Sequence, residues 1–548
     1  MTPSSKSILI IGSGISGLTC AIECASRGMN VMLTSPFPSE RSQSVLAAGG
    51  INCVLPKEGS PDTIKQHIED TLKGGCNIAG RRAVEGLCNE APDVVKWLES
   101  LGTVFTRDED GNIRSRAFGG QTYPRTYFAG TSTGKQIVTA LVMEARRYEG
   151  MGLIRRLFWT DFYAGLIKDG RCHGALMYNE ATRSVESITA DAVVVATGGQ
   201  NALFGKTTGS TQCDGYTAGK LFTQGVDLKN LEFIQYHPTA IETDQKMMLI
   251  SEAARGEGGR LYYEDEGKRV YFMEDKYGER GNLMPRDVVS REIYMTGRQV
   301  YLDVTFLGDK KIKERLPEIY ELCMKYRNLD ITRSSIPIKP SVHFFMGGIA
   351  VGLNHETRIK NLYAIGECAS IYHGANRLGG NSLLAAIYSG RVAARSIAAS
   401  DGGMKEEDWS SDVRKAQSDL ESRRASKSRF SVTYVRRMIT EAIDGSLGIV
   451  REKETLTKGI NDIDYYMSVA DKINYDSSEF EYLNYSLNGL LTLAKAVMIS
   501  ADSRCESRGA HLRSDYTETE EDYCRSTIIS YDGGKYTTSL VAEDEYGS

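Results

Sequence analysis

With 548 residues the chain is too long for one compact core, so we expect two to four domains. Hydrophobic residues make up 41% and charged residues 25%, as in an ordinary globular protein, and a net charge of −5 leaves no basic excess for a nucleic-acid partner. The eleven cysteines show no C-x-x-C spacing, which argues against a disulfide framework and against a bound iron–sulfur cluster.

The sequence contains no segment that predicts insertion into a membrane. No apolar run reaches the ~18 residues of a transmembrane helix. The apolar stretch from Ile8 to Ile11 is too short for a leader peptide. We therefore expect a cytoplasmic protein. Any contact with the membrane should be peripheral, at the inner face of the cell membrane, and made only through partner subunits.

The N-terminal segment predicts a strand, a glycine-rich turn, a helix and a second strand. Ile8 to Ile11 form the continuous apolar run of a strand that is buried on both faces. Gly12-Ser13-Gly14-Ile15-Ser16-Gly17 follows, and apolar residues then recur at helical spacing as far as Gly28. This glycine suits the left-handed end of a helix, and the next strand begins at Val31.

A G-x-G-x-x-G turn between a strand and a helix is typical of a dinucleotide site. The first glycine permits the tight turn, the second lets the backbone approach a pyrophosphate, and the third allows close packing of helix on strand. The helix N-terminus adds partial positive charge. Thr34 and Ser35 stand where an NAD site has an acidic residue, so the pattern favours FAD over NAD.

Two more buried strands, Ala192 to Ala196 and Leu362 to Ile365, each run into a glycine turn. Because they are far from the first strand in sequence, we expect one nucleotide-binding domain assembled from residues 1–232 and 346–400. Residues 233–345 form an inserted domain in this division. Asp401-Gly402-Gly403 indicates a linker, and residues 401–548 show helical patterns to about residue 505 and then a strand-like tail.

Short motifs occur along almost the whole chain. They include Arg41-Ser42-Gln43-Ser44, Gln235-Tyr236-His237-Pro238-Thr239, Arg255-Gly256-Glu257-Gly258-Gly259, Pro285-Arg286-Asp287, His373-Gly374-Ala375-Asn376-Arg377-Leu378 and Glu506-Ser507-Arg508-Gly509-Ala510-His511. In this order they resemble the succinate dehydrogenase and fumarate reductase flavoprotein family. The resemblance implies an α/β fold: a Rossmann-like FAD-binding domain, an inserted α+β capping domain and a C-terminal helical domain.

Together with the glycine turn and the hydroxyls at Thr34 and Ser35, the resemblance implies a set of FAD contacts. They are Gly12, Ser13, Gly14, Ile15, Ser16, Gly17, Thr34, Ser35, Ser42, Ser44, Gly49, Gly50, Asp214, Glu367, Ser382 and Leu383. Family members often tether FAD covalently through a histidine where this chain has Gln43, which has no nucleophilic ring nitrogen. We therefore predict non-covalent FAD. Without the electron-withdrawing bond the flavin is a better reductant, which favours fumarate reduction over succinate oxidation.

The resemblance also assigns residues to the reaction of a C4 dicarboxylate, which needs cations for two carboxylates, a hydride and a proton. The implied carboxylate contacts are His237, Ser251, His343 and Arg377, of which the arginine can bind bidentately. Arg286 is the implied proton donor, resupplied through Glu252 and Arg255. On their own these residues would equally suit a surface helix pair, a solvated arginine and a turn. No metal site is predicted, because the histidines lack zinc-like spacing.

Other functions stay open at this point. L-aspartate oxidase, a relative with non-covalent FAD, fits Gln43, but it typically has a cysteine near Gly347-Gly348, where this chain has Phe345-Met346. A reductase of another enoate, or a protein that binds FAD for structural reasons, is disfavoured by the retained cationic residues. Most members of the resembled family pair with an iron–sulfur subunit, so we expect such a partner, although the tail after His511 is shorter than usual.

Overall fold

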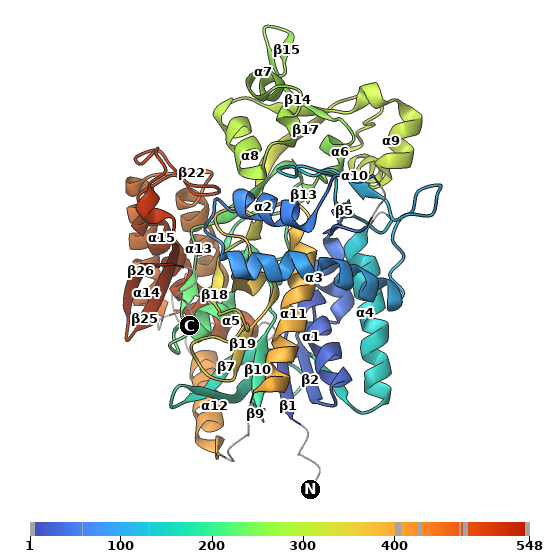
Figure 1. Cartoon of the computed structure of the whole chain (residues 1–548). Helices are drawn as coiled ribbons and strands as arrows, with labels where there is room; N and C mark the ends of the chain where they lie inside the picture. Colours follow the sequence, from blue (N-terminus) through green and yellow to red (C-terminus); the bar gives the residue numbers. More distant parts are fainter. Residues whose placement is uncertain are drawn as a thin grey trace.

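The computed structural model describes residues 6–56, 59–130, 132–400, 407–425, 430–470, 473–474 and 481–542. The expected linker at Asp401-Gly402-Gly403 lies outside these residues. In Figure 1 the inserted part lies at the top in green and yellow, and the C-terminal helices lie at the left in orange and red. The N-terminal α/β part fills the centre, below the inserted part.

A five-stranded parallel sheet forms the core of the α/β part. Its order is β19 (Leu362–Ala364), β10 (Ala192–Val195), β1 (Ser7–Ile11), β2 (Asn30–Ser35) and β6 (Ile154–Phe158). The strands expected from three distant segments are therefore direct neighbours. β6 was not expected, because its sequence Ile-Arg-Arg-Leu-Phe at the half-exposed edge lacks the apolar run that marks a central strand.

Two helices pack closely in front of this sheet. α1 (Ile15–Ser26) lies against α11 (Asn381–Ala399), and Gly390 permits the close approach, because an added Cβ would lie 2.8 Å from the Ser16 carbonyl oxygen. Gly28 ends α1 with φ +79°, as its position predicts. α4 (Thr133–Gly150) packs beside α1, α3 (Arg81–Ser100) crosses α11, and α2 (Ile64–Gly74) lies against α3, as Figure 1 shows.

The chain between β6 and β10 forms a separate antiparallel sheet of β7 (Thr160–Lys168), β8 (Arg171–Asn179) and β9 (Ser184–Thr189). Helix α5 (Tyr216–Phe222) follows β10. A smaller sheet joins β3 (Ile51–Asn52), β5 (Thr126–Tyr127) and β4 (Ser115–Arg116). The β7–β9 sheet contacts the parallel sheet through β8 against β10 and β7 against β2.

The inserted part is built on its own six-stranded sheet. The order is β13 (Met247–Leu249), β12 (Ile234–Glu242), β17 (Ile336–Phe345), β16 (Val300–Asp303), β14 (Arg260–Asp265) and β15 (Lys268–Val270). Its helices are α6 (Ala253–Gly256), α7 (Phe272–Tyr277), α8 (Arg286–Met295), α9 (Asp309–Arg315) and α10 (Pro317–Arg327). A separate buried cluster that includes Ile241, Leu261 and Leu302 gives this part its own core.

The C-terminal part contains helices and a returning pair of strands. The helices are α12 (Ser410–Ala425), α13 (Val432–Ser446), α14 (Lys453–Val469) and α15 (Glu481–Ser503). The tail strands β25 (Ser526–Asp532) and β26 (Lys535–Val541) extend a sheet with β11 (Leu228–Lys229), β18 (Gly348–Ala350) and β20 (Ala369–Ser370). Short pairs join β21 (Phe430–Ser431) to β23 (Ile473–Asn474) and β22 (Val450–Arg451) to β24 (Leu512–Arg513). The tail therefore packs on the body of the protein.

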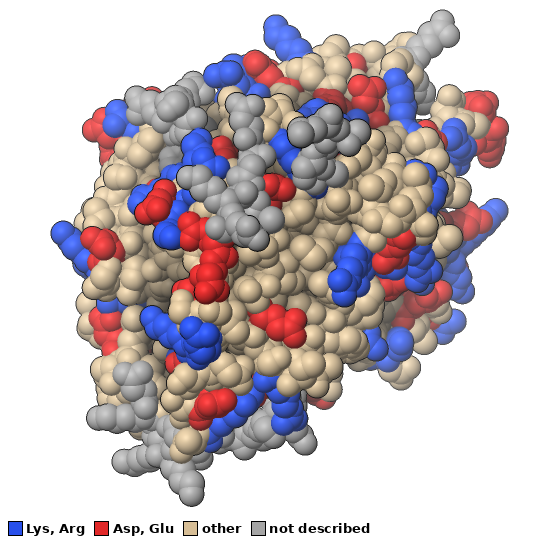
Figure 2. Space-filling view, turned by 90° about the horizontal axis from the view of Figure 1, so that it is seen from below, with Lys and Arg blue, Asp and Glu red and all other residues tan. Residues whose placement is uncertain are grey.

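The surface carries charges of both signs. Figure 2 shows lysine and arginine interspersed with aspartate and glutamate on the face seen from below, with no extended field of one sign. Within the described ranges, no helix combines the length and apolar character that crossing a bilayer requires.

Candidate active site

One cavity of about 420 Å³ connects the parallel sheet with the inserted part. At one end it is lined by the glycine-rich turn after β1, and at the other by side chains of β12, α8 and β17. Residues that are far apart in sequence thus share one continuous space. A ligand bound at one end of this space could therefore meet a ligand bound at the other.

The glycine-rich turn leaves room only for backbone. Gly12 has φ +111°, and an added Cβ would lie 2.3 Å from the Ala196 carbonyl oxygen. On Gly17 an added Cβ would lie 1.9 Å from the Gly12 carbonyl oxygen, so this residue serves the packing of α1 on β1. The Ile15 amide donates to Ser44 Oγ at 3.1 Å, which ties the turn to the short helix η2 (Gln43–Leu46).

Most residues of the expected FAD set line the cavity. These are Gly12, Ser13, Gly14, Ser16, Thr34, Ser35, Ser42, Ser44, Gly49, Gly50, Asp214, Glu367, Ser382 and Leu383. Ile15 and Gly17 are buried behind it. The Thr34 hydroxyl donates to the Ile10 carbonyl at 3.2 Å, so only its lone pairs are left for a ribose.

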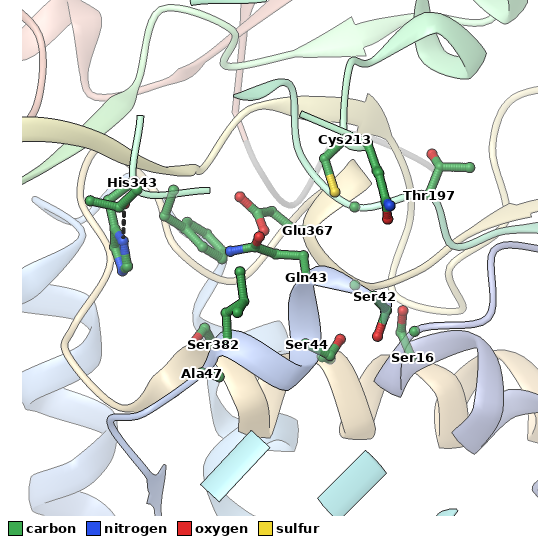
Figure 3. A pocket seen from close by; sticks show the side chains of 18 of the residues that line it. Ser16, Ser42, Gln43, Ser44, Ala47, Thr197, Cys213, His343, Glu367 and Ser382 are labelled. Carbon is green, nitrogen blue, oxygen red and sulfur yellow. Dashed lines mark hydrogen bonds between the residues drawn. The ribbon is translucent and has the colours of Figure 1, made fainter. Parts of the chain in front are cut away.

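Where the cavity approaches the inserted part, Gln43 and Glu367 supply polar groups. Figure 3 shows both among the side chains that line the pocket, together with Ser44 and Ser382. Gln43 Oε1 and Ser42 Oγ are buried and have no hydrogen-bond partner within the described chain. Burial raises the pKa of Glu367 to about 7. Unsatisfied polar atoms beside a backbone-lined turn fit a polar cofactor such as FAD.

At the other end of the cavity, one glutamate joins two arginines. Glu252 Oε2 accepts from Arg286 Nη2 at 2.7 Å and Nε at 2.9 Å, and its Oε1 lies 3.2 Å from Arg255 Nη2. Burial pushes the pKa of Glu252 upward, but the charges of Arg286 and Arg255 outweigh it and lower the pKa to about 2. All three side chains are buried, so neither a surface helix pair nor a solvated arginine describes them.

Two histidines face each other beside this group. The rings of His237 on β12 and His343 on β17 have centroids 5.0 Å apart, and both residues line the cavity together with Ser251. His343 Nδ1 hydrogen-bonds to Thr208 Oγ1 at 2.9 Å, a bond drawn in Figure 3. Burial and the neighbouring arginines hold the pKa of His237 well below its usual range, and burial and His237 do the same for His343. Both imidazoles are therefore neutral at pH 7.

Arg377 completes the cationic end. Its guanidinium lies over the Phe344 ring, 4.2 Å from the centroid, and its Nη2 donates to Gln235 Oε1 at 3.0 Å. Burial and the charge of Arg286 hold the pKa of Arg377 well below its usual value. The structure thus brings together His237, Ser251, Glu252, Arg286, His343 and Arg377 in the cavity wall, with Arg255 directly behind Glu252.

Sequence reasoning gave no role to two residues of this group. Gln235 contacts both Arg286 and Arg377, and its position two residues before His237 on a strand was a usable signal, because such residues share a face. Thr208 lies on a loop, and nothing local in the sequence places it beside His343. Among the described residues, no three His, Cys, Asp or Glu side chains gather in a way that could hold a metal ion.

Comparison with known proteins agrees with this architecture. A family model described as an FAD binding domain matches residues 7–383, and a second, described as the fumarate reductase flavoprotein C-terminal region, matches residues 436–544. The succinate dehydrogenase flavoprotein subunit of Bacillus subtilis is 37% identical over 96% of this chain and 94% of its own. The fumarate reductase flavoprotein subunit of Haemophilus influenzae is 32% identical over 99% of this chain and 96% of its own.

A solved quinol fumarate reductase chain of E. coli superposes with a TM-score of 0.88 at 30% identity, covering 98% of this chain and 96% of that one. The expected FAD-binding, capping and C-terminal architecture is therefore confirmed. Since sequence and structure agree over almost all of the chain, the protein belongs to the succinate dehydrogenase and fumarate reductase flavoprotein family and is an FAD-dependent oxidoreductase.

Proposed function

We propose that this chain is the catalytic flavoprotein subunit of a fumarate reductase or succinate dehydrogenase, and that it reduces fumarate. The observation that carries the proposal is a buried series of side-chain contacts, the contact chain, which shares its cavity with the FAD-binding turn. The contact chain runs from Arg255 through Glu252, Arg286 and Gln235 to Arg377. Three arginines and one glutamate leave it with a net charge of +2.

A net charge of this size calls for a particular ligand. Unpaired charge in a protein interior is costly, because the surroundings replace water poorly. A dicarboxylate carries two negative charges and so balances the net charge of the contact chain, whereas a monocarboxylate leaves one positive charge without a partner. The neutral His237 and His343 add hydrogen-bonding groups to the same wall and no further charge. This favours a C4 dicarboxylate over an enoate with one acid group.

Hydride transfer is the chemistry that FAD supplies when it is bound. The protein's own residues bind the acid and move the proton. Arg377 and the histidines hold the carboxylates, and Arg286 gives its proton to the substrate carbon that the hydride does not attack. Because Glu252 bonds to Arg286 Nη2 and also lies against Arg255, a proton can be resupplied as it leaves, and neutral arginine does not accumulate.

Non-covalent FAD and the direction of the reaction depend on Gln43. Its side chain projects into the cavity, at the position where the family resemblance implies a tethering histidine, and an amide forms no such bond. Acid denaturation should release all of the flavin into the supernatant. A flavin midpoint potential well above that of the fumarate/succinate couple would contradict fumarate reduction as the favoured direction.

The remaining assignments follow from the same family. The capping domain spans residues 233–345, between two halves of the FAD-binding domain at 1–232 and 346–400, and residues 401–548 form the C-terminal domain. Relatives described as subunits, and as quinol fumarate reductases, support an iron–sulfur partner that supplies the electrons. Such a partner would place this chain at the inner face of the cell membrane without inserting it.

The direct test uses the purified protein with its flavin reduced by dithionite under nitrogen. We expect fumarate to reoxidise the flavin and yield succinate, while crotonate, which has one carboxylate, does not. Reoxidation by neither acid would overturn the proposal. Release of hydrogen peroxide from L-aspartate in air would instead identify an aspartate oxidase.

A further inference from the structure

Gln235 lies between the two cavity-lining arginines at the dicarboxylate end of the cavity. Its Oε1 accepts from Arg286 Nη1 at 3.1 Å and from Arg377 Nη2 at 3.0 Å. The residue is completely buried, with 0% of its surface exposed. Because a guanidinium can only donate hydrogen bonds, the oxygen of the amide must be the atom that faces both cations.

The nitrogen of the same amide is fixed as firmly. Nε2 donates to Asn376 Oδ1 and to the Arg377 carbonyl oxygen, both at 2.8 Å. Asn376 in turn donates to Asp287 Oδ1 at 2.8 Å. If the Gln235 amide were turned over, its nitrogen would face two donors and its oxygen two acceptors. The hydrogen bonds therefore allow this side chain one orientation, with its oxygen toward the arginines.

We infer that Gln235 is a positioning residue for the dicarboxylate reaction, an inference that rests on the proposed function. Its single oxygen fixes the distance between Arg286, which gives the proton, and Arg377, which holds a carboxylate. Two like charges in a buried site repel each other, and a shared acceptor holds them together. Because the amide is neutral, the positive charge stays available to the substrate.

This second property explains why an amide suits the position better than a carboxylate. Glutamate would also accept from both arginines, and more strongly. However, it would lower the net charge of the contact chain from +2 to +1 and compete with the substrate for the same donors. The acceptor geometry and the charge can therefore be tested separately with two substitutions of nearly the same size.

The two variants are Gln235→Glu, which keeps the acceptor and adds charge, and Gln235→Met, which removes the acceptor and adds none. Malonate is the binding probe, because it has two carboxylates and no double bond to reduce, and calorimetry measures its Kd. Gln224 provides the matched control, since its amide bonds only to the Gly165 backbone at 2.9 Å, away from the arginines. Gln224→Glu and Gln224→Met should leave malonate binding and fumarate reduction unchanged.

We expect Gln235→Glu to raise the Kd of malonate on the order of 100-fold, because one negative charge is added a few ångströms from the ligand. Gln235→Met should change this Kd by less than about tenfold and lower kcat on the order of 100-fold, because no shared acceptor then fixes the positions of the two arginines. FAD content and melting temperature verify that each variant is folded. The kcat and KM split of Gln235→Met stands by itself if the glutamate variant does not fold.

The outcomes separate this inference from the function on which it rests. An active parent with a Gln235→Met variant of unchanged kcat overturns the positioning role. An active parent with a Gln235→Glu variant that binds malonate normally overturns the role of the neutral charge. A parent that neither binds malonate nor is reoxidised by fumarate overturns the proposed function, and the inference with it.

Discussion

The two ends of the cavity are built on different physical grounds. At the turn after β1, glycines bring bare backbone and the start of a helix to the ligand, and hydroxyl groups complete the wall. At the opposite end, buried charges contact one another and leave a net excess that a ligand must balance. In the proposed function, shape selects the cofactor at the first end, and charge balance selects the substrate at the second. Substitutions should therefore separate FAD binding from turnover.

Removal of the proposed proton donor should give the largest effect. Arg286→Gln keeps a polar side chain beside Glu252 but cannot deliver the proton, so fumarate reduction should fall about 10⁴-fold. FAD content should remain that of the parent, because Arg286 lies at the end of the cavity away from the turn. The measurement is reoxidation of the reduced flavin by fumarate. Arg298→Gln, at an exposed position in the capping domain, is the control. If Arg286→Gln lost FAD to the same extent as it lost activity, FAD binding and turnover would not be separable.

The converse change acts on the turn. In Gly12→Ala the new Cβ would lie 2.3 Å from a backbone oxygen that cannot move aside, so FAD affinity should fall at least about 100-fold. Gly28→Ala is a matched control: φ is also positive, at +79°, but the Cβ would meet nothing within 4 Å. Titration of the apoprotein with FAD measures both. If the two variants lose FAD equally, backbone strain rather than close approach governs the site.

The pH dependence of stability should show what the buried charges at the substrate end contribute to the folded state. The pKa of Glu252 is lowered from 4.5 to about 2, so its ionised form stabilises the folded state. This stabilisation, about 3 kcal/mol, is fully present above pH 4.5 and is lost as the pH falls through about 2. The melting temperatures of the parent and of Glu252→Gln, with excess FAD, should therefore differ at pH 7 and converge in acid. Glu109→Gln, at an exposed site, should show no such convergence.

The difference between the glycine-rich end and the charged end of the cavity also explains how much of the site the sequence could predict. Gly12, Gly14 and Gly17 lie within six positions between a strand and a helix, so local pattern suffices to identify the turn. The charged end joins residues from β12, α8 and the loop before α11, and no spacing in the sequence predicts that Arg286 and Arg377 share one acceptor. Their proposed roles were accessible only through resemblance to a family, and contacts between distant segments, such as that of Thr208, were not accessible at all.

The elements of the fold that the sequence did not predict also depend on contacts between distant segments. β6 begins Ile154-Arg155-Arg156 at the edge of the sheet, where Arg155 is exposed and Arg156 pairs with Glu149 at 2.6 Å. The tail was predicted as strand-like, and β25 and β26 confirm this. The pairing of β25 with β11, some three hundred positions earlier in the chain, is set by tertiary packing. Local pattern therefore identifies the kind of element more readily than its partner.

The smallest expected effect concerns Thr208, which connects the charged end to the FAD-binding part. Its hydroxyl donates to the Val342 carbonyl oxygen at 3.1 Å, and its oxygen lies 2.9 Å from His343 Nδ1, so the contact favours one orientation of the ring that faces the substrate end. Thr208→Val keeps the shape and removes this preference, which should lower kcat/KM for fumarate about tenfold. Thr492→Val, a buried threonine on α15 whose hydroxyl donates to a helix carbonyl, is the control. Steady-state kinetics with unchanged FAD content would show that a single hydrogen bond tunes the substrate end and leaves the cofactor end as it was. If Thr208→Val loses FAD as well, the two ends are coupled through this loop, and recognition by shape and by charge cannot be treated separately.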